Sequence, residues 1–217
     1  SMSDHPRYHR LSIIMPVFNE RPTVREIVGR VLDVDLGGLE RELVIVDDGS
    51  TDGTREVLEE LAAARPEVSV ILQPRNRGKG AAVARGLRHA GGDVLIIQDA
   101  DLEYDPAEYP QVLGPILAGE ADVVFGSRFQ GSAGGRRVLY FWHSVGNRLL
   151  TLAANVFSNL NLTDMETCYK AMTREVAERL DLVSRRFGIE PEITCKVARL
   201  RARIYEVPVS YSGRTYD

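Results

Sequence analysis

Two aspartates separated by one residue are the part of this sequence best suited to hold a metal ion. Asp99 and Asp101 follow a run of apolar residues, and Glu103 adds a third carboxylate two positions later. Alternate residues of an extended segment point the same way, so both aspartates can face one ligand. Carboxylate oxygens suit Mg²⁺ or Mn²⁺, and these ions also bind diphosphate oxygens. Helix-capping and turn acids are the alternative explanation of so short a motif, but further polar clusters favour the metal site.

A basic, glycine-rich segment at 75–80, RNRGKG, is suited to bind a diphosphate. Backbone amides at a helix start, together with Lys79, would form an anion cradle. The segment is not a P-loop, because neither Ser nor Thr follows the lysine. It partly matches a dinucleotide fingerprint through Gly78 and Gly80, but Val83 stands where the third small residue belongs. The spacing therefore disfavours a dinucleotide cofactor.

Two more polar clusters are suited to bind a nucleoside. In PVFNE, at 16–20, Phe18 can lie against a base and Glu20 can bind a ribose. In DDGS, at 47–50, a carboxylate can accept hydrogen bonds from a base edge or a ribose. The structural alternatives are an ordinary strand-to-helix loop for the first cluster and a helix-capping turn for the second.

The elements that must position these clusters alternate along the chain. Apolar runs predict strands at 11–15, 43–46, 68–72, 94–97 and 121–125, with the first ended by Pro16. Apolar residues at helical spacing predict a helix after each of the first four strands, including 81–90 and 106–117. Continuously apolar strands joined by helices indicate an α/β fold, with a mainly parallel sheet and helices on both faces. Ligands bind beyond the carboxyl ends of such strands. Each of the four clusters, and also GSR at 126–128, follows a predicted strand, so all five should lie at the same edge of the sheet.

The last third of the chain has a different pattern. Residues 140–157 predict an apolar helix after a glycine-rich loop at 131–137. A short strand near 169–172, helices at 175–182 and 192–200, and a strand at 203–207 follow. Without an internal repeat or a linker, we expect a single domain over 11–217, preceded by a flexible tail at 1–10.

Composition limits the class of protein. The chain has 217 residues, of which 44% are hydrophobic, and a net charge of −4 from 27 basic and 31 acidic residues. This balance excludes a disordered chain and disfavours a nucleic-acid-binding surface. Two cysteines are too few for a disulfide framework, which predicts a cytoplasmic protein. No segment approaches the roughly 20 apolar residues that span a bilayer.

Taken together, IIMPVFNE, ELVIVDDGSTDGT, NRGKGAA, VLIIQDADLEYDP and VVFGSRF resemble family 2 glycosyltransferases, which have the GT-A fold. The later segments LTDMETCYKAM, RFGIEPEITCKVA and YEVPVSYSGRTY are similar to the dolichyl-phosphate mannosyltransferase and polyprenyl-phosphate glycosyltransferase branch. The resemblance implies an inverting, metal-dependent hexosyltransferase. Its donor would be a nucleotide-sugar, GDP-mannose or UDP-glucose, and its acceptor a polyprenyl or dolichyl phosphate at the cytoplasmic membrane face.

The resemblance also implies roles for individual residues. The nucleoside would be held by Pro16, Phe18, Glu20, Val46 and Asp48, and the donor would be lined by Asp99 and Ala100. Asp101, with Glu103, would bind the metal, although relatives often have Gln at the position of Glu103. Arg128 and Arg214 match arginines that bind the donor and acceptor phosphates, while His143 and Asn147 match contacts to the lipid phosphate. Relatives commonly carry another basic residue beyond the one matching Arg214, whereas this chain ends at Asp217.

A phosphate acceptor agrees with the residues available for chemistry. A phosphate monoester has a second pKa of about 6, so the nucleophile is ionised at neutral pH and needs no base. Catalysis then requires alignment, screening of two anions by Arg128 and Arg214, and stabilisation of the leaving diphosphate. A soluble saccharide or small alcohol as acceptor is the alternative, and it needs a base such as Glu103 or Asp164. A catalytically inactive nucleotide-sugar-binding module is a third interpretation.

A lipid acceptor also gives the segment at 138–157 a role. Arg136 and Arg137 can meet anionic head groups while Leu139, Phe141 and Trp142 enter the interface. The alternative is an apolar helix packed in the core. We expect a peripheral protein on the inner face of the plasma membrane.

Overall fold

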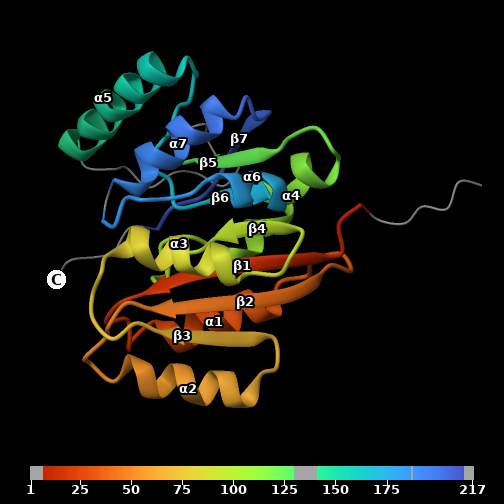
Figure 1. Ribbon diagram of the computed structural model, residues 1–217, viewed down its shortest axis with the longest axis vertical. Helices are drawn as coiled ribbons and strands as arrows, with labels where there is room; N and C mark the ends of the chain where they lie inside the picture. Colours follow the sequence, from red (N-terminus) through yellow and green to blue (C-terminus); the bar gives the residue numbers. More distant parts are fainter. Residues whose placement is uncertain (1–6, 130–140, 187, 213–217) are drawn as a thin grey trace, which may run out of the picture.

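The computed structural model describes residues 7–129, 141–186 and 188–212, and these form one seven-stranded sheet (Figure 1). The strands are β1 (Arg10–Val17), β2 (Glu40–Asp47), β3 (Val68–Leu72), β4 (Val94–Ile97), β5 (Val123–Ser127), β6 (Lys170–Thr173) and β7 (Ile204–Pro208). The helices are α1 (Val24–Asp33), α2 (Thr54–Ala64), α3 (Lys79–His89), the short 3-10 helix η1 (Pro106–Glu108), α4 (Tyr109–Leu117), α5 (Phe141–Ser158), α6 (Arg174–Arg179) and α7 (Ile189–Arg199).

The sheet has the order β3-β2-β1-β4-β6-β5-β7, and β6 alone among these strands runs antiparallel to its neighbours. The four residues of β4 are all buried, as are the five residues of β5. Helix α3 packs on β1 and β2 in front of the sheet, while α1 lies behind it (Figure 1). The predicted α/β class, with a mainly parallel sheet covered on both faces, is confirmed.

Strand β1 extends two residues beyond its predicted end, because Pro16 lies within the strand and does not end it. The carbonyl of Ile14 accepts a hydrogen bond from the Gln98 amide on the β4 side, at 2.9 Å. Alternate residues of a strand bond to the same neighbour, so the nitrogen of Pro16 also faces that side. Since β4 ends at Ile97, no hydrogen bond between β1 and β4 is lost through the missing N–H of Pro16. Strand β1 can therefore continue to Val17 at the edge of the site.

The predicted boundary of the domain at residue 11 lies inside β1, which begins at Arg10. The amides of His9 and Arg10 donate to Asp93 Oδ2 at 2.7 and 3.0 Å, and these bonds fix the start of the strand. Residues 1–6 of the predicted tail lie outside the described residues.

Helix α5 leaves much of its apolar side exposed. It packs against α7, at the upper left of Figure 1. Its exposed apolar side chains include Leu149, Leu150, Leu152, Val156 and Phe157, the last 86% exposed. Among the described residues, no helix combines the length and the hydropathy that crossing a bilayer requires.

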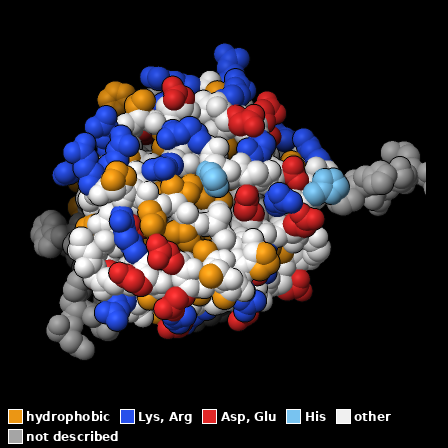
Figure 2. Space-filling view, turned by 60° about the horizontal axis from the view of Figure 1, so that its bottom comes forward, with side chains coloured by type: hydrophobic (Ala, Val, Ile, Leu, Met, Phe, Trp, Pro, Cys, Tyr) orange, Lys and Arg blue, Asp and Glu red, His pale blue; other side chains and the backbone are white. Residues whose placement is uncertain are grey.

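Charges of both signs are mixed on the face of the molecule that Figure 2 shows. Basic side chains gather at the upper left of this view, while acidic and basic side chains lie together elsewhere around hydrophobic side chains near the centre. Several basic side chains form exposed ion pairs, among them Arg25 with Glu60 and Arg30 with Glu26.

Candidate active site

A cavity of about 820 Å³ opens at the carboxyl ends of β1, β2 and β4. Its lining consists of Pro16, Val17, Phe18, Glu20, Asp48, Asn76, Gly78, Lys79, Asp99, Ala100, Asp101, Glu103 and Arg186. The structure therefore brings together the residues predicted from four separate polar clusters. Val46 is the exception among the predicted nucleoside residues, because its side chain lies in the core with no exposed surface.

Asp48 is oriented toward the glycine-rich segment. Its Oδ1 accepts hydrogen bonds from Gln73 Nε2 at 2.9 Å and from the Arg77 amide at 2.7 Å. Its Oδ2 accepts from the Gly78 amide at 2.8 Å. With 3% of the residue exposed, Asp48 fixes the segment at 75–80 against β2 while it contributes to the cavity wall.

The glycines of this segment allow a second chain segment to approach. Gly78 has φ +94°, in the region that favours glycine, and a Cβ there would lie 2.2 Å from the carbonyl oxygen of Arg185. A Cβ on Gly80 would lie 2.2 Å from the carbonyl oxygen of Ser184. The Ala81 amide donates to that Arg185 carbonyl at 3.2 Å. The segment at 184–186 thus packs on the start of α3 and places Arg186 beside the cavity.

Gly80→Ala is expected to lower the free energy of unfolding by about 1–3 kcal/mol, because the methyl group would overlap the Ser184 carbonyl. Urea denaturation followed by circular dichroism measures this change. Gly29→Ala is the matched control, since Gly29 lies inside α1 with no atom within 4 Å of its Cβ position. That substitution should raise the free energy of unfolding by up to about 1 kcal/mol. Equal stabilities for the two variants would refute the packing argument.

Lys79, the first residue of α3, is bound by two carboxylates. Its Nζ lies 2.8 Å from Asp99 Oδ1, 3.0 Å from Asp99 Oδ2 and 3.6 Å from Glu190 Oε1. Burial raises the pKa of Asp99, but the charge and hydrogen bond of Lys79 outweigh it and hold that pKa below its usual value. The predicted diphosphate-binding lysine is therefore paired with a predicted metal ligand.

The carboxylates of the cavity do not form a complete metal site. They fit an ion that binds together with a diphosphate. Among the described residues, no group of three or more His, Cys, Asp or Glu side chains is arranged to hold a metal ion. Asp101 Oδ1 accepts from the Glu103 amide at 3.2 Å, and Glu103 Oε2 accepts from the Tyr211 hydroxyl at 3.2 Å. Mg²⁺ is usually held by only one or two carboxylates plus substrate phosphates. Asp101 and Glu103 satisfy that requirement.

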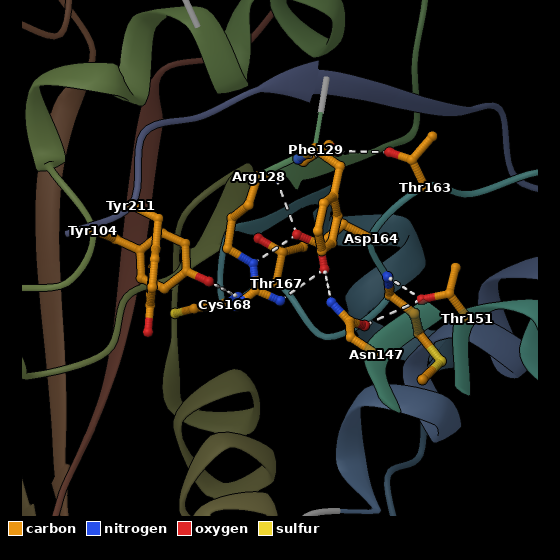
Figure 3. Close-up of polar contacts among 12 residues, drawn as sticks. Tyr104, Arg128, Phe129, Asn147, Thr151, Thr163, Asp164, Thr167, Cys168 and Tyr211 are labelled. Carbon is orange, nitrogen blue, oxygen red and sulfur yellow. Dashed lines mark hydrogen bonds and ion pairs between the residues drawn. The ribbon is translucent and has the colours of Figure 1, made fainter. Parts of the chain in front are cut away.

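Arg128 forms the centre of a second polar cluster, with Asp164 and Asn147 beside it (Figure 3). Its Nε lies 2.7 Å from Asp164 Oδ2 and its Nη2 lies 2.8 Å from Asp164 Oδ1, a bidentate pair. Asn147 Nδ2 donates to Asp164 Oδ1 at 3.0 Å and Thr151 donates to the Asn147 side-chain carbonyl at 3.2 Å. Asp164 is fully buried, and although burial raises its pKa, the bonds from Arg128 hold the pKa below its usual value.

Tyr211 connects the Arg128 cluster to the cavity. The Arg128 guanidinium lies 5.3 Å from the centre of the Tyr211 ring, and the Tyr211 hydroxyl donates to Glu103. Burial, and after it the charge of Glu103, raises the pKa of Tyr211 to about 12. Arg128 and Asn147 are not among the residues that line the cavity. Arg128 contacts Tyr211 and Asn147 contacts Asp164 instead.

Two predicted residues cannot be placed in the site. Arg214 lies outside the described residues, and so does the glycine-rich loop predicted at 131–137. His143 lies in α5, but its side chain is outside the description. For these residues the predicted contacts with phosphate stay predictions.

Four residues of the site were missed by reasoning from the sequence. These are Arg186 in the cavity wall, Tyr211 between the two clusters, and the pair of Glu190 and Lys170 behind Lys79. The helix predicted at 192–200 begins at Ile189 in the structure, which brings Glu190 into the first turn of α7. The run FGIEPE, with one acid just before proline, was the signal for an earlier helix start.

Comparison with known proteins agrees with the geometry. Residues 12–181 match the model of the family described as Glycosyl transferase family 2. The dolichol-phosphate mannosyltransferase of Pyrococcus furiosus is 31% identical over 94% of this chain, and the chain spans 57% of that relative's length. The undecaprenyl-phosphate mannosyltransferase of Micrococcus luteus is 31% identical over 94% of this chain and 84% of its own length.

A solved structure has the same fold. The glucosyl-3-phosphoglycerate synthase of Mycobacterium tuberculosis in complex with Mn²⁺, uridine diphosphate and glucosyl-3-phosphoglycerate superposes with a TM-score of 0.72. The superposition covers 96% of this chain and 73% of that protein at 23% identity. From the family match and the relatives together, this chain belongs to glycosyl transferase family 2.

Proposed function

We propose that this protein transfers a hexose from a nucleotide-sugar to a polyprenyl phosphate, with inversion at the anomeric carbon. The observation that carries the proposal is the cavity that collects Phe18, Glu20, Asp99, Asp101 and Glu103 at one end of the sheet. Relatives named for mannosyl transfer to dolichol phosphate and undecaprenyl phosphate support the acceptor class and favour mannose.

For this reaction the protein needs only to align the two substrates and to supply positive charge. A phosphate oxygen of the acceptor attacks the anomeric carbon, and the bond from that carbon to the diphosphate oxygen breaks. No proton has to be removed, because the acceptor phosphate is already ionised at neutral pH. Asp101 and Glu103 would hold Mg²⁺ or Mn²⁺, which supplies positive charge to the leaving diphosphate. The Mn²⁺ complex of the structural neighbour supports a divalent ion.

The Arg128 cluster argues against one of the two candidate bases that a sugar hydroxyl acceptor would need. A hydroxyl acceptor needs a base, and Asp164 was one of the two carboxylates expected to serve. Asp164 is buried, paired with Arg128 and held at a low pKa, so it cannot take a proton near neutral pH. Arg128 would then contribute positive charge toward the phosphates from behind Tyr211, whose ring centre lies 5.3 Å from the guanidinium.

Incubation with GDP-mannose, UDP-glucose and related donors, plus a short polyprenyl phosphate and Mg²⁺ or Mn²⁺, tests the proposed function. Mass spectrometry should detect a lipid-linked hexose from one donor. Parallel reactions with free sugars and with glycerol phosphates in place of the lipid separate a lipid acceptor from a soluble one. Product only in the soluble arms would overturn the acceptor assignment, and no product from any donor would favour the inactive binding module.

The exposed side of α5 is the part of this protein that we expect to contact a membrane. Replacing Leu152 and Phe157 together by glutamate should abolish flotation with anionic liposomes, because both side chains are largely exposed and apolar. Leu117→Glu is the control, since Leu117 is 40% exposed at the end of α4 and lies away from α5 (Figure 1). Wild-type protein that fails to float, or a control as impaired as the double variant, would argue against α5 as the contact.

A further inference from the structure

Lys79 neutralises Asp99 in the cavity wall, a role that a bound metal ion could otherwise take. Its Nζ contacts both oxygens of Asp99, at 2.8 and 3.0 Å, on the wall of the cavity. That wall also carries Asp101 and Glu103, the carboxylates that fit a divalent ion. A divalent ion held by these carboxylates would share the cavity wall with the ammonium of Lys79, and the two positive charges would repel each other.

A second carboxylate offers Lys79 another position close by. Glu190 Oε1 lies 3.6 Å from Lys79 Nζ, so a movement of about one ångström suffices to exchange the closer partner. Glu190 itself is fixed from behind, because its Oε2 is bound by the ammonium of Lys170. Lys170 is fully buried and also donates to the Thr167 carbonyl. Glu190 is therefore held in place by Lys170, and Lys79 can pair either with Asp99 or with Glu190.

We propose that Lys79 is a temporary counterion of Asp99. It neutralises Asp99 until a nucleoside diphosphate and its divalent ion enter the cavity, and it then moves toward Glu190 and the diphosphate. This inference rests on the proposed function, because it takes the metal and the nucleotide to bind together in this cavity. Glu190 and Lys170 are positioning residues in this scheme. Their pair holds the alternative site of the lysine in place.

The arrangement makes metal binding depend on the nucleotide. Without nucleotide, an ion at Asp101 and Glu103 is opposed by the charge of Lys79, and the lysine has only Asp99 and Glu190 to bind. With nucleotide, the diphosphate offers oxygens both to the ion and to Lys79. Because binding free energies are reciprocal, the nucleotide must raise the affinity for the ion by the same factor by which the ion raises the affinity for the nucleotide.

Mn²⁺ binding measured by electron paramagnetic resonance, with and without GDP or UDP, tests the proposal without any turnover. Wild-type protein should bind Mn²⁺ weakly alone and much more tightly with one of the nucleotides. Lys79→Met should bind Mn²⁺ alone about tenfold more tightly, since removing a neighbouring cation shifts a carboxylate's affinity for positive charge by about that factor. The enhancement by nucleotide should shrink accordingly.

Glu190→Gln should have the opposite effect, because Lys79 then loses its second carboxylate and stays on Asp99. Its Mn²⁺ affinity without nucleotide should fall below that of the wild type, which a merely structural role of Glu190 does not predict for a folded variant. Lys196→Met is the matched control: Lys196 pairs with Glu192 in α7, 2.7 Å apart, and does not line the cavity. It should bind Mn²⁺ like the wild type, and circular dichroism checks the fold of each variant.

The outcomes separate the inference from the proposed function. If wild-type protein binds Mn²⁺ with nucleotide but Lys79→Met leaves the affinity for Mn²⁺ alone unchanged, Lys79 is not a temporary counterion of Asp99 and the inference is wrong. If Glu190→Gln strengthens Mn²⁺ binding, the exchange toward Glu190 is wrong. If the wild type binds no Mn²⁺ with any nucleotide, the metal-dependent function fails and the inference fails with it.

Discussion

Replacing Asp101 with asparagine should reduce hexose transfer at least about a thousandfold while the protein stays folded. Asp101 lines the cavity beside Glu103, where the proposed function would have the leaving diphosphate gather negative charge. Losing an electrostatic contact of this kind typically costs about 10²–10³ in rate, and the loss of a metal ligand adds to that. The side-chain oxygen of asparagine can still accept the Glu103 amide, so the local turn is preserved. Single-turnover transfer at saturating donor measures the effect.

Asp105→Asn is the matched control for this experiment. Asp105 lies in the same loop, is exposed, and accepts the Ala107 amide at the start of η1. It does not line the cavity, and its substitution should leave the rate within about twofold, as for most surface changes. A wild-type rate in Asp101→Asn would remove the metal assignment. A loss in both variants would show that the loop, and not the carboxylate, matters.

Arg128→Met should both destabilise the protein and slow transfer. The substitution leaves Asp164 as a buried carboxylate without its bidentate partner, which typically costs about 3–5 kcal/mol in the free energy of unfolding. The rate should fall at least about a hundredfold, because a positive charge near the phosphates is gone. Denaturation by guanidinium chloride and assays well below the melting temperature measure the two effects separately.

The double variant Arg128→Met/Asp164→Asn tests which effect is structural. Removing both charges should restore most of the lost stability, since no uncompensated carboxylate stays buried, but it should not restore the rate. The pH dependence gives a second check. Because the folded protein holds the pKa of Asp164 below its usual value, the pair contributes stability above about pH 4 and loses it as the pH falls further. The double variant should lack this contribution, and recovery of transfer in it would make Arg128 dispensable.

The strands were the part of the fold that the sequence predicted best, because they are short, continuously apolar and bounded by polar clusters. The strand predicted at 68–72 and the one at 94–97 have the same bounds in the structure. The error at Pro16 came from treating proline as a strand end without knowing which neighbour its nitrogen faces. The antiparallel place of β6 depends on pairing with β4, more than seventy positions earlier, and with β5, more than forty positions earlier, which no local pattern encodes.

The lining of the cavity was largely predictable, since its residues follow strands that end at one edge of the sheet. What local patterns could not supply was the pairing of charges. Lys79 was predicted as a free phosphate ligand, yet the fold gives it Asp99 and Glu190 as partners from β4's end and from α7. Asp164 was considered as a base because the sequence does not say that it faces Arg128 in the interior.

The place of β5 in the sheet has a consequence for how the polypeptide is made. Both neighbours of β5, β6 and β7, come later in the sequence, so residues 123–127 leave the ribosome before either partner exists. Strands β1 to β4 can pair among themselves as soon as residue 97 has emerged. Closing the long loops to β6 and β7 carries the larger entropic cost. Arg128, just after β5, therefore reaches its final surroundings only when the carboxy-terminal third of the chain has been synthesised.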